Sequence, residues 1–215
     1  MTPENFIRAN ARLTAPPLVP EISLHLAVEV VPLWRKTEKE LEAAGVPPPY
    51  WAFAWAGGQA LARYILDHPQ IVHARRALDF GSGSGLVAIA AAKAGAAKVT
   101  AADIDRFAAA AIALNTAANG VAVETTRDDL IGSTRDWNII LVGDMCYERP
   151  LAERLLAWLG VRAAAGTLVL LGDPGRAYLP QSGLERLHTY DVPVSRELED
   201  GDMRATGVYR LSGGH

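Results

Sequence analysis

Asp79-Phe80-Gly81-Ser82-Gly83-Ser84-Gly85 is the stretch that decides the fold of this 215-residue chain. The apolar run 76–80 leads into it and predicts a strand, and the helix-forming residues 86–94 that follow predict a helix. A second apolar run, 98–102, ends at Asp103. A strand, a glycine turn, a helix and a second strand that ends in an acid favour a nucleoside-bearing cofactor, because bare backbone approaches the ligand and the carboxylate accepts from ribose hydroxyls.

The glycine spacing of this turn indicates which cofactor binds. A dinucleotide fingerprint reads G-x-G-x-x-G and sets a pyrophosphate against a helix N-terminus, whereas this turn reads G-x-G-x-G. Asp79, two residues before the first glycine, would repel a pyrophosphate and attract an ammonium group. S-adenosylmethionine carries an amino group and a sulfonium and no phosphate. The sequence therefore predicts S-adenosylmethionine as the cofactor, with S-adenosylhomocysteine as the product, and argues against a nicotinamide dinucleotide.

Bulk composition predicts a single soluble α/β domain, with an N-terminal extension over residues 1–70 and a methyltransferase core over 71–215. Half of the residues are hydrophobic, and a net charge of −3 disfavours broad attraction to nucleic acid. Cys146 is the only cysteine, and no apolar run approaches the roughly 18 residues of a membrane span. The first residues lack the layout of a signal peptide. We expect a cytoplasmic monomer that binds neither nucleic acid nor membrane.

Hydrophobic periodicity predicts strands and helices that alternate along most of the chain. Before residue 70 we expect helices at 3–13, 32–44 and 57–68 and a strand at 22–30. After it we expect strands at 75–80, 98–102, 121–125, 138–143 and 166–172, and helices at 84–94, 105–119, 148–160 and 180–187. Two further runs, 188–194 and 203–210, predict a terminal antiparallel hairpin. This plan is the seven-stranded, Rossmann-like class I methyltransferase fold, with a mostly parallel sheet.

Several segments resemble the seven-β-strand protein lysine methyltransferases: the turn 79–85, Asp103-Ile104-Asp105 and Gly143-Asp144-Met145-Cys146-Tyr147-Glu148. The segment 50–64 resembles the branch of that family that modifies the β subunit of electron transfer flavoprotein, and 6–10 and 21–24 are similar to its bacterial members. The resemblance implies N-methylation of lysines in that subunit, with S-adenosylmethionine as donor. Two alternatives stay open: a methyltransferase of ribosomal proteins, which shares this scaffold, and a catalytically idle module that keeps the fold as a partner surface.

Asp144 is the first candidate for a catalytic residue. It follows the predicted strand 138–143, and open α/β sheets place their ligands at the carboxyl ends of their strands. The resemblance to the Asp-x-x-Tyr motif of the family implies that Asp144 orients the acceptor amine. The alternative is a helix N-cap, because a predicted helix begins at Glu148.

Tyr147 is the second catalytic candidate, as an aromatic wall of the channel for the lysine cation. The alternative is a tyrosine that packs against the start of the helix. Methyltransferases that act on base amino groups follow their Asp or Asn with two prolines, and Met145-Cys146 stands in that place here. This difference argues against a flipped base as the substrate.

The cofactor is expected to contact residues from four parts of the chain. Asp79 would reach its amino group, Asp103 its ribose hydroxyls, and Asp128 or Asp129 its adenine, although these two acids could instead be solvated. Of the aromatic residues Trp51, Phe53 and Trp55, which could also be core, the resemblance implies that Trp55 covers the donor. The full expected set is Trp55, Asp79, Gly81, Ser82, Gly83, Gly85, Asp103, Ile104, Asp128, Asp129 and Leu130.

No metal ion is expected. The histidines show no paired spacing such as H-x-x-x-H. The sequence suggests no histidine partner near Cys146. We therefore interpret Cys146 as a small buried thiol and not as a nucleophile.

Overall fold

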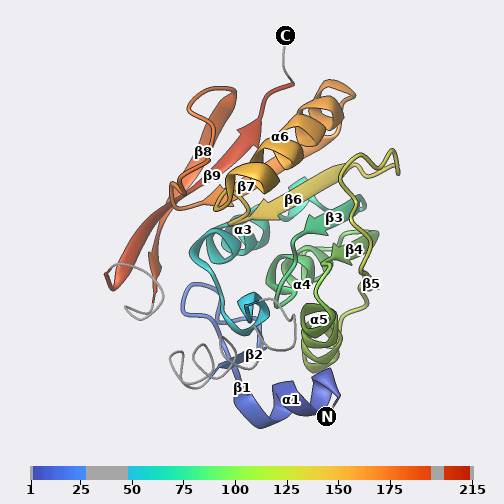
Figure 1. The fold of residues 1–215 in the computed structure, drawn as a ribbon, viewed down its shortest axis with the longest axis vertical. Coiled ribbons are helices and arrows are strands. Elements are labelled where there is room, and N and C mark those ends of the chain that lie inside the picture. The colour runs from blue at the N-terminus through green and yellow to red at the C-terminus, as the bar shows by residue number, and fades with distance from the viewer. Residues whose placement is uncertain (1, 28–47, 195–200, 214–215) are drawn as a thin grey trace.

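The computed structural model describes residues 2–27, 48–194 and 201–213, and its centre is one seven-stranded sheet (Figure 1). The strand order is β5-β4-β3-β6-β7-β9-β8. The first five of these pair in parallel, and β9 runs antiparallel to both β7 and β8. The predicted fold class is therefore confirmed. The strands are β3 (Arg76–Phe80), β4 (Lys98–Ala102), β5 (Glu124–Thr126), β6 (Ile139–Gly143), β7 (Leu168–Asp173), β8 (Leu184–Pro193) and β9 (Met203–Leu211).

Helices cover both faces of the sheet because its central strands are apolar on both sides. In β6, Ile139 and Leu141 face one core together with helices α3 and α4, while Ile140 and Val142 face a second core with α6. Figure 1 shows α6 on one side and α3, α4 and α5 on the other. The helices are α3 (Ala56–Asp67), α4 (Leu86–Lys93), α5 (Arg106–Ala118) and α6 (Arg149–Ala164), with two short 3-10 turns, η1 (Tyr50–Ala52) and η2 (Pro69–Ile71).

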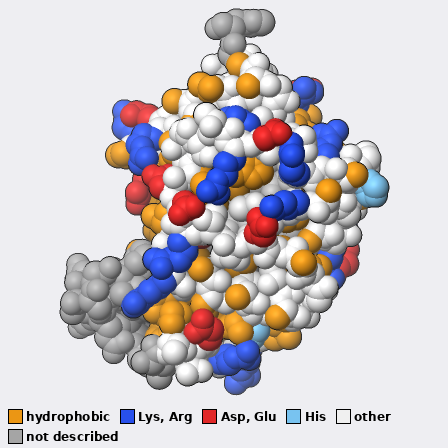
Figure 2. Space-filling view, turned by 90° about the vertical axis from the view of Figure 1, so that its right-hand side faces the viewer, with side chains coloured by type: hydrophobic (Ala, Val, Ile, Leu, Met, Phe, Trp, Pro, Cys, Tyr) orange, Lys and Arg blue, Asp and Glu red, His pale blue; other side chains and the backbone are white. Residues whose placement is uncertain are grey.

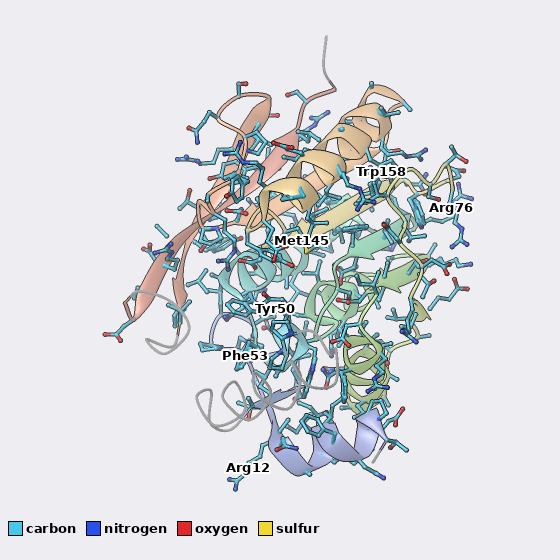
Figure 3. All side chains as sticks on the ribbon, viewed as in Figure 1. Arg12, Tyr50, Phe53, Arg76, Met145 and Trp158 are labelled. Atoms are coloured by element: carbon cyan, nitrogen blue, oxygen red, sulfur yellow. The ribbon has the colours of Figure 1, made fainter. Side chains whose placement is uncertain are left out.

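The α6 side is closed by an aromatic contact. Trp158, labelled in Figure 3, lies on α6 and packs on Phe80 at the end of β3, with ring centroids 5.7 Å apart. The indole Nε1 of Trp158 donates to the carbonyl of Ser133 at 3.0 Å, so its one polar atom is satisfied. None of the described helices combines the length and the hydropathy needed to cross a bilayer.

The N-terminal segment differs from its prediction. Helix α1 (Pro3–Asn10) ends three residues before the predicted end at 13, because residues from Ala11 onward leave the helix to form strand β1 (Ala11–Thr14). This strand pairs antiparallel with β2 (Leu24–Ala27), a non-local contact that helical periodicity cannot report. The part of the predicted strand at 28–30, and the predicted helix at 32–44, lie outside the described residues.

The C-terminal half holds the second wrong prediction. Residues 180–187 form no helix; β8 begins at Leu184 instead, because β9 continues to Leu211 and Leu184 pairs with it there. Leu184 and Leu187 pack on the two cores and the residues between them are exposed, so their spacing of three resembles that of an amphipathic helix. Strand β5 is also displaced, to 124–126 from the predicted 121–125.

One backbone contact sets the distance between helix α3 and the sheet. A Cβ atom placed on Gly57 would lie 2.1 Å from the carbonyl oxygen of Gly172 and 2.6 Å from Oδ2 of Asp144. A Cβ atom placed on Gly172 would lie 2.1 Å from the carbonyl oxygen of Gly57. The first turn of α3 therefore rests directly on the carboxyl ends of β6 and β7, at a distance that only glycine allows.

We expect Gly57→Ala to lower the free energy of unfolding by about 1–3 kcal/mol, because the added methyl group displaces backbone that cannot rotate away. Gly58→Ala is the matched control, since a Cβ atom there meets nothing within 4 Å. It should leave stability within about 1 kcal/mol of the wild type or raise it, because alanine favours a helix over glycine. Urea unfolding measures both variants, and equal stability of the two would contradict the assigned contact.

Candidate active site

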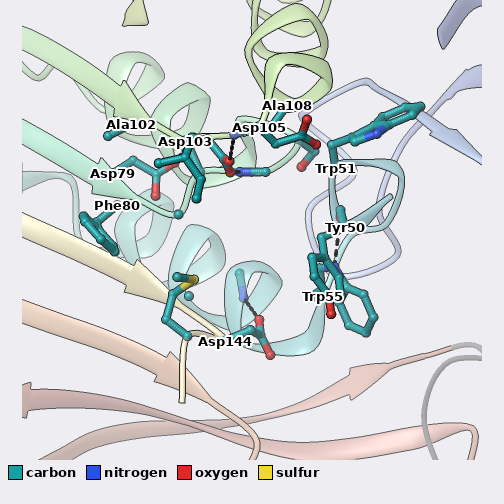
Figure 4. Close-up of a pocket in the computed structure, with 18 of the residues that line it drawn as sticks. Tyr50, Trp51, Trp55, Asp79, Phe80, Ala102, Asp103, Asp105, Ala108 and Asp144 are labelled. Atoms are coloured by element: carbon teal, nitrogen blue, oxygen red, sulfur yellow. Dashed lines mark hydrogen bonds between the residues drawn. The ribbon is translucent and has the colours of Figure 1, made fainter. Parts of the chain in front are cut away.

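A cavity of about 390 Å³ opens at the carboxyl ends of the central strands, beside the first turn of α3 (Figure 4). Its walls are the glycine turn after β3, the ends of β4 and β6, the segment from Tyr50 to Trp55 and the loop after β5. Of the predicted site residues, eleven line it: Trp55, Asp79, Gly81, Ser82, Gly83, Asp103, Ile104, Asp128, Asp129, Asp144 and Tyr147. Residues from distant parts of the sequence thus meet in one pocket, as the strand ends of an open α/β sheet require.

Two predicted residues stand behind this wall. Gly85 has φ +85° and precedes α4, and a Cβ atom there would lie 3.4 Å from Ile112. Leu130 is buried and belongs to the core on the α6 side, with Phe80 and Trp137. Neither residue lines the cavity, although Phe80, in the same core as Leu130, does.

The glycine turn is held against β4 by its own backbone. The N–H groups of Gly81 and Ser82 both donate to the carbonyl oxygen of Ala102, at 2.9 and 3.1 Å. Gly81 has φ +66°, and a Cβ atom there would lie 2.4 Å from the sulfur of Met145. The absence of side chains therefore serves both the conformation of the turn and the space in front of it.

Asp79 is a buried acid at the base of the turn, 2 % exposed. Its Oδ2 accepts from the hydroxyl of Ser82 at 2.5 Å and from the N–H of Ala88 at 3.0 Å. Burial raises the pKa of Asp79 to about 7, which these two hydrogen bonds oppose and the nearby Asp103 reinforces. A ligand with an ammonium group at this end would supply the positive charge that favours the ionised carboxylate.

Asp103 lies at the end of β4 and fixes the neighbouring loops. Its Oδ2 accepts from the N–H of Gly83 at 2.9 Å and its Oδ1 from the N–H of Asp105 at 3.0 Å (Figure 4). Burial raises the pKa of Asp103, and the two N–H groups lower it. Each oxygen retains a lone pair, so the carboxylate can also accept hydroxyl groups from the cavity.

The two acids after β5 differ in their partners. Asp129 is engaged on both oxygens, by the N–H of Ile131 at 3.0 Å and by Arg154 at 2.9 Å. Asp128 has a looser ion pair, 3.6 Å from Arg135. Both line the cavity, together with the exposed side chain of Ile104.

Asp144 occupies the opposite end of the cavity, 8 % exposed and with φ +59°, a left-handed conformation rare for residues other than glycine. Its Oδ2 accepts from the N–H of Gly58 at 2.8 Å, drawn as a dashed line in Figure 4. Its Oδ1 accepts from Nε and Nη2 of Arg176, at 3.0 and 2.6 Å. Burial raises the pKa of Asp144, and the charge of Arg176 opposes that change. The N-cap of α6 is Glu148, so the alternative that Asp144 caps that helix is wrong.

Aromatic rings surround this end. Tyr50 packs on Tyr147, with ring centroids 5.5 Å apart, and on Trp55 at 6.1 Å. The guanidinium of Arg176 lies 5.5 Å from the ring centre of Trp55. Burial raises the pKa of Tyr147 to about 12, so its hydroxyl is neutral at pH 7. Trp51 and Phe53 also line the cavity, but most of each side chain is buried in a core that includes Ile7.

Sequence reasoning missed Arg176, Tyr50 and Arg154, all of which line the cavity. The sequence signal for Arg176 was its place shortly after the predicted strand 166–172, which is the position where ligand residues of an open α/β sheet are expected. Asp173 fixes that turn by accepting from the N–H groups of Gly175 and Arg176, at 2.8 and 2.7 Å. Only the order of the strands, which the sequence does not state, brings this turn beside Asp144.

The histidine and cysteine side chains of the described residues take no part in the cavity walls. In these residues no three His, Cys, Asp or Glu side chains come together as metal ligands would. Cys146 is buried, and burial raises its pKa to about 12, which keeps the thiol protonated. The interpretation of Cys146 as a small buried thiol is confirmed.

The seven-stranded sheet, the glycine turn and the acids at its strand ends define a class I, S-adenosylmethionine-dependent methyltransferase. The fold is shared with solved structures such as magnesium protoporphyrin IX methyltransferase from Synechocystis PCC 6803, determined with S-adenosylmethionine bound, with a TM-score of 0.53 and 16% identity over 73% of this chain and 80% of that one. A family model described as ribosomal protein L11 methyltransferase (PrmA) matches residues 60–142.

Curated relatives narrow the class. Electron transfer flavoprotein beta subunit lysine methyltransferase from Xenopus laevis is 45% identical, over 96% of this chain and 86% of the relative. The protein of the same name from Danio rerio is 40% identical, over 97% of this chain and 83% of the relative. The chain belongs to the electron transfer flavoprotein beta subunit lysine methyltransferase family.

We expect Asp79→Asn to remove a pH dependence from the stability of the ligand-free protein. The pKa of Asp79 in the folded state, about 7, lies above its ordinary value of 3.8. Between these values the folded state keeps a proton that the unfolded state has released, so the wild type loses stability as the pH rises through this window. The loss can reach about 1.4 kcal/mol per pH unit.

Urea unfolding of the wild type and of Asp79→Asn at about pH 4 and about pH 8 measures this effect. The stability of the variant relative to the wild type should increase between the two pH values. A difference that stays constant would mean that Asp79 titrates alike in the folded and unfolded chains.

Proposed function

We propose that the protein transfers methyl groups from S-adenosylmethionine to lysine side chains of the β subunit of electron transfer flavoprotein. The observation that carries this proposal is one cavity with two different ends. Asp79 and Asp103 stand at one end with the glycine turn, and Asp144 stands at the other among Tyr50, Trp55 and Tyr147. The first end suits the donor and the second suits a lysine, and the named relatives support the choice of protein substrate.

The donor would bind along the glycine turn. Asp79 would face its ammonium group and Asp103 its ribose hydroxyls, while Gly81, Ser82 and Gly83 allow its close approach. Asp128 is the better of the two candidates for the adenine amino group, because its ion pair is longer than that of Asp129. Ile104 would cover an apolar part of the donor, and Trp55 would contact the donor as well as the acceptor lysine.

Methyl transfer to an amine is a direct displacement. The amine nitrogen forms a bond to the methyl carbon as the carbon–sulfur bond breaks, which leaves S-adenosylhomocysteine, and the surplus proton goes to water. A free lysine has a pKa near 10.4, so its neutral form costs about 4–5 kcal/mol at pH 7. The aromatic walls desolvate the ammonium and lower this cost, and Asp144 can accept an N–H so that the lone pair points at the methyl carbon.

The reaction as proposed needs no metal ion, because the sulfonium is already an activated leaving group. Nor do we propose a nucleic acid substrate. On the side of the molecule where β5 ends the sheet, basic and acidic side chains alternate around an apolar hollow (Figure 2). Lys98 pairs there with Glu124 at 2.9 Å, and Arg76 pairs with Asp136. Such paired charges give no uniform positive surface for a phosphate backbone. We also propose that the protein acts as a monomer.

A ribosomal protein is the second candidate substrate, because the matching family model is that of a ribosomal protein L11 methyltransferase. Incubation with labelled S-adenosylmethionine and either purified flavoprotein or purified L11 separates the two. Mass spectrometry of the modified peptides should find methylated lysines in the flavoprotein β subunit. Labelling of L11 alone would replace the proposed substrate, and labelling of neither would favour a catalytically idle module.

We expect Asp144→Asn to reduce kcat on the flavoprotein by on the order of 100-fold or more, because the amide no longer orients the amine as a carboxylate does. Donor affinity, measured by calorimetry, should stay within about threefold of the wild type, because Asp144 lies at the acceptor end. Asp136→Asn is the control, an exposed acid outside this cavity, and should keep full activity. Full turnover in Asp144→Asn would exclude the role.

A further inference from the structure

The carboxylate at the acceptor end already has a cationic partner. Arg176 donates two hydrogen bonds to Oδ1 of Asp144, and the N–H of Gly58 donates one to Oδ2. An ionised carboxylate has about four lone-pair sites, so these three bonds from described residues leave one site, on Oδ2. Asp144 can therefore accept a single further hydrogen bond, in a direction that its partners fix.

Arg176 is itself held in place from both ends. Its backbone N–H donates to Asp173, which is 1 % exposed at the end of β7. Its guanidinium lies 5.5 Å from the ring centre of Trp55, and its side chain is 18 % exposed. An arginine anchored in this way keeps its fork aimed at one carboxylate oxygen.

The charge balance decides what Asp144 does to an incoming lysine. A lone carboxylate beside the acceptor would stabilise the ammonium form, which has no lone pair and cannot react. A carboxylate paired with a guanidinium still accepts an N–H but attracts a cation less. The positive end of α3, which presents the N–H of Gly58, acts in the same direction.

We propose that Arg176 is a positioning residue of the methyl transfer: it fixes the orientation of Asp144 and balances its charge, so that the acceptor lysine is held as the neutral amine. This inference rests on the proposed function, and it concerns the step after the substrate has bound. Arg176 acts through Asp144 and not by contact with the transferred methyl group.

The other groups that act on this end do not replace Arg176. From β7 the acid Asp173 faces Asp144, and the described first turn of α3 carries no acid. The loop after β6 and η1 contribute Cys146, Tyr147, Glu148 and Tyr50. Burial raises the pKa of Cys146, Tyr147 and Tyr50, and the charge of Arg176 opposes that rise in all three. The remaining described groups named here are neutral or acidic, so the loss of Arg176 leaves a net negative charge around the lysine.

The test is the pH dependence of kcat at saturating flavoprotein and donor. In Arg176→Gln, the acid limb of the profile should move to higher pH by about 1–3 units, because the unbalanced carboxylate raises the pKa of the bound lysine. Activity near pH 7 should fall by about tenfold for each unit and return at higher pH. Arg176→Met, which keeps an apolar stem beside Trp55, should show the same shift.

Arg176→Lys separates charge from geometry. It keeps the positive charge, so its acid limb should coincide with that of the wild type, while its plateau falls because one ammonium cannot reproduce the two bonds of the fork. Donor affinity by calorimetry should stay unchanged in all variants, which also shows that they are folded. Arg186→Gln is the matched control: that guanidinium also lies over a ring, Tyr209 at 5.6 Å, but outside the cavity, so its profile should match the wild type.

Two results would overturn the inference. Acid limbs of Arg176→Gln and Arg176→Met that coincide with the wild type would show that Arg176 does not set the charge state of the lysine. An acid limb of Arg176→Lys displaced by a unit or more would show the same, and it decides the question if the neutral variants fail to fold. A wild-type protein that binds the donor but methylates no flavoprotein would instead refute the proposed substrate.

Discussion

The backbone contact between Gly57 and Gly172 is the constraint on which the acceptor end depends. Because neither residue has a side chain, the first turn of α3 comes close enough for the N–H of Gly58 to bond Asp144. The same contact places the segment that precedes α3, with Tyr50 and Trp55, over the ends of the strands. A helix even one methyl group further away would lose the bond to Asp144 and would open the aromatic wall to water, where every electrostatic interaction is weaker.

The two ends of the cavity use acids in opposite ways, and their partners explain why. Asp79 accepts only from neutral donors among its described contacts, so burial raises its pKa to about 7 and a cationic ligand group would favour its ionisation. Asp144 is also buried, but it is bonded by a guanidinium and by a helix N-terminus. In the proposed reaction, the first acid would face the ammonium group of the donor, and the second would hold an amine that must lose its charge before it reacts.

Local signals in the sequence predicted the cavity residues that directly follow strands, whereas the partners of Asp144 could be found only from the fold. The glycine turn, Asp103 and Asp144 each follow a strand directly, so a strand prediction and one rule about strand ends were sufficient. Arg176 also follows a strand, but its role depends on β7 lying next to β6, and Tyr50 depends on α3. The prediction of a helix at 180–187 was wrong for a similar reason. The strand conformation from Leu184 onward depends on pairing with β9, which lies more than ten residues further along the chain.

A buried asparagine links the donor end to the N-terminal strands. Asn115 in α5 is fully buried; its Nδ2 donates to the carbonyl of Ser84 in the glycine turn at 2.8 Å, and its Oδ1 accepts from the N–H of His25 in β2, also at 2.8 Å. Asn119, the C-cap residue of α5, exchanges hydrogen bonds with the backbone of Ser23. The side-chain amides of Asn115 and Asn119 bond backbone groups of the glycine turn and of the segment that carries β2. Helix α5 therefore supports both the turn that would hold the donor and the N-terminal strands. The N-terminal strands therefore help to fix the geometry of the donor end, although none of their residues lines the cavity.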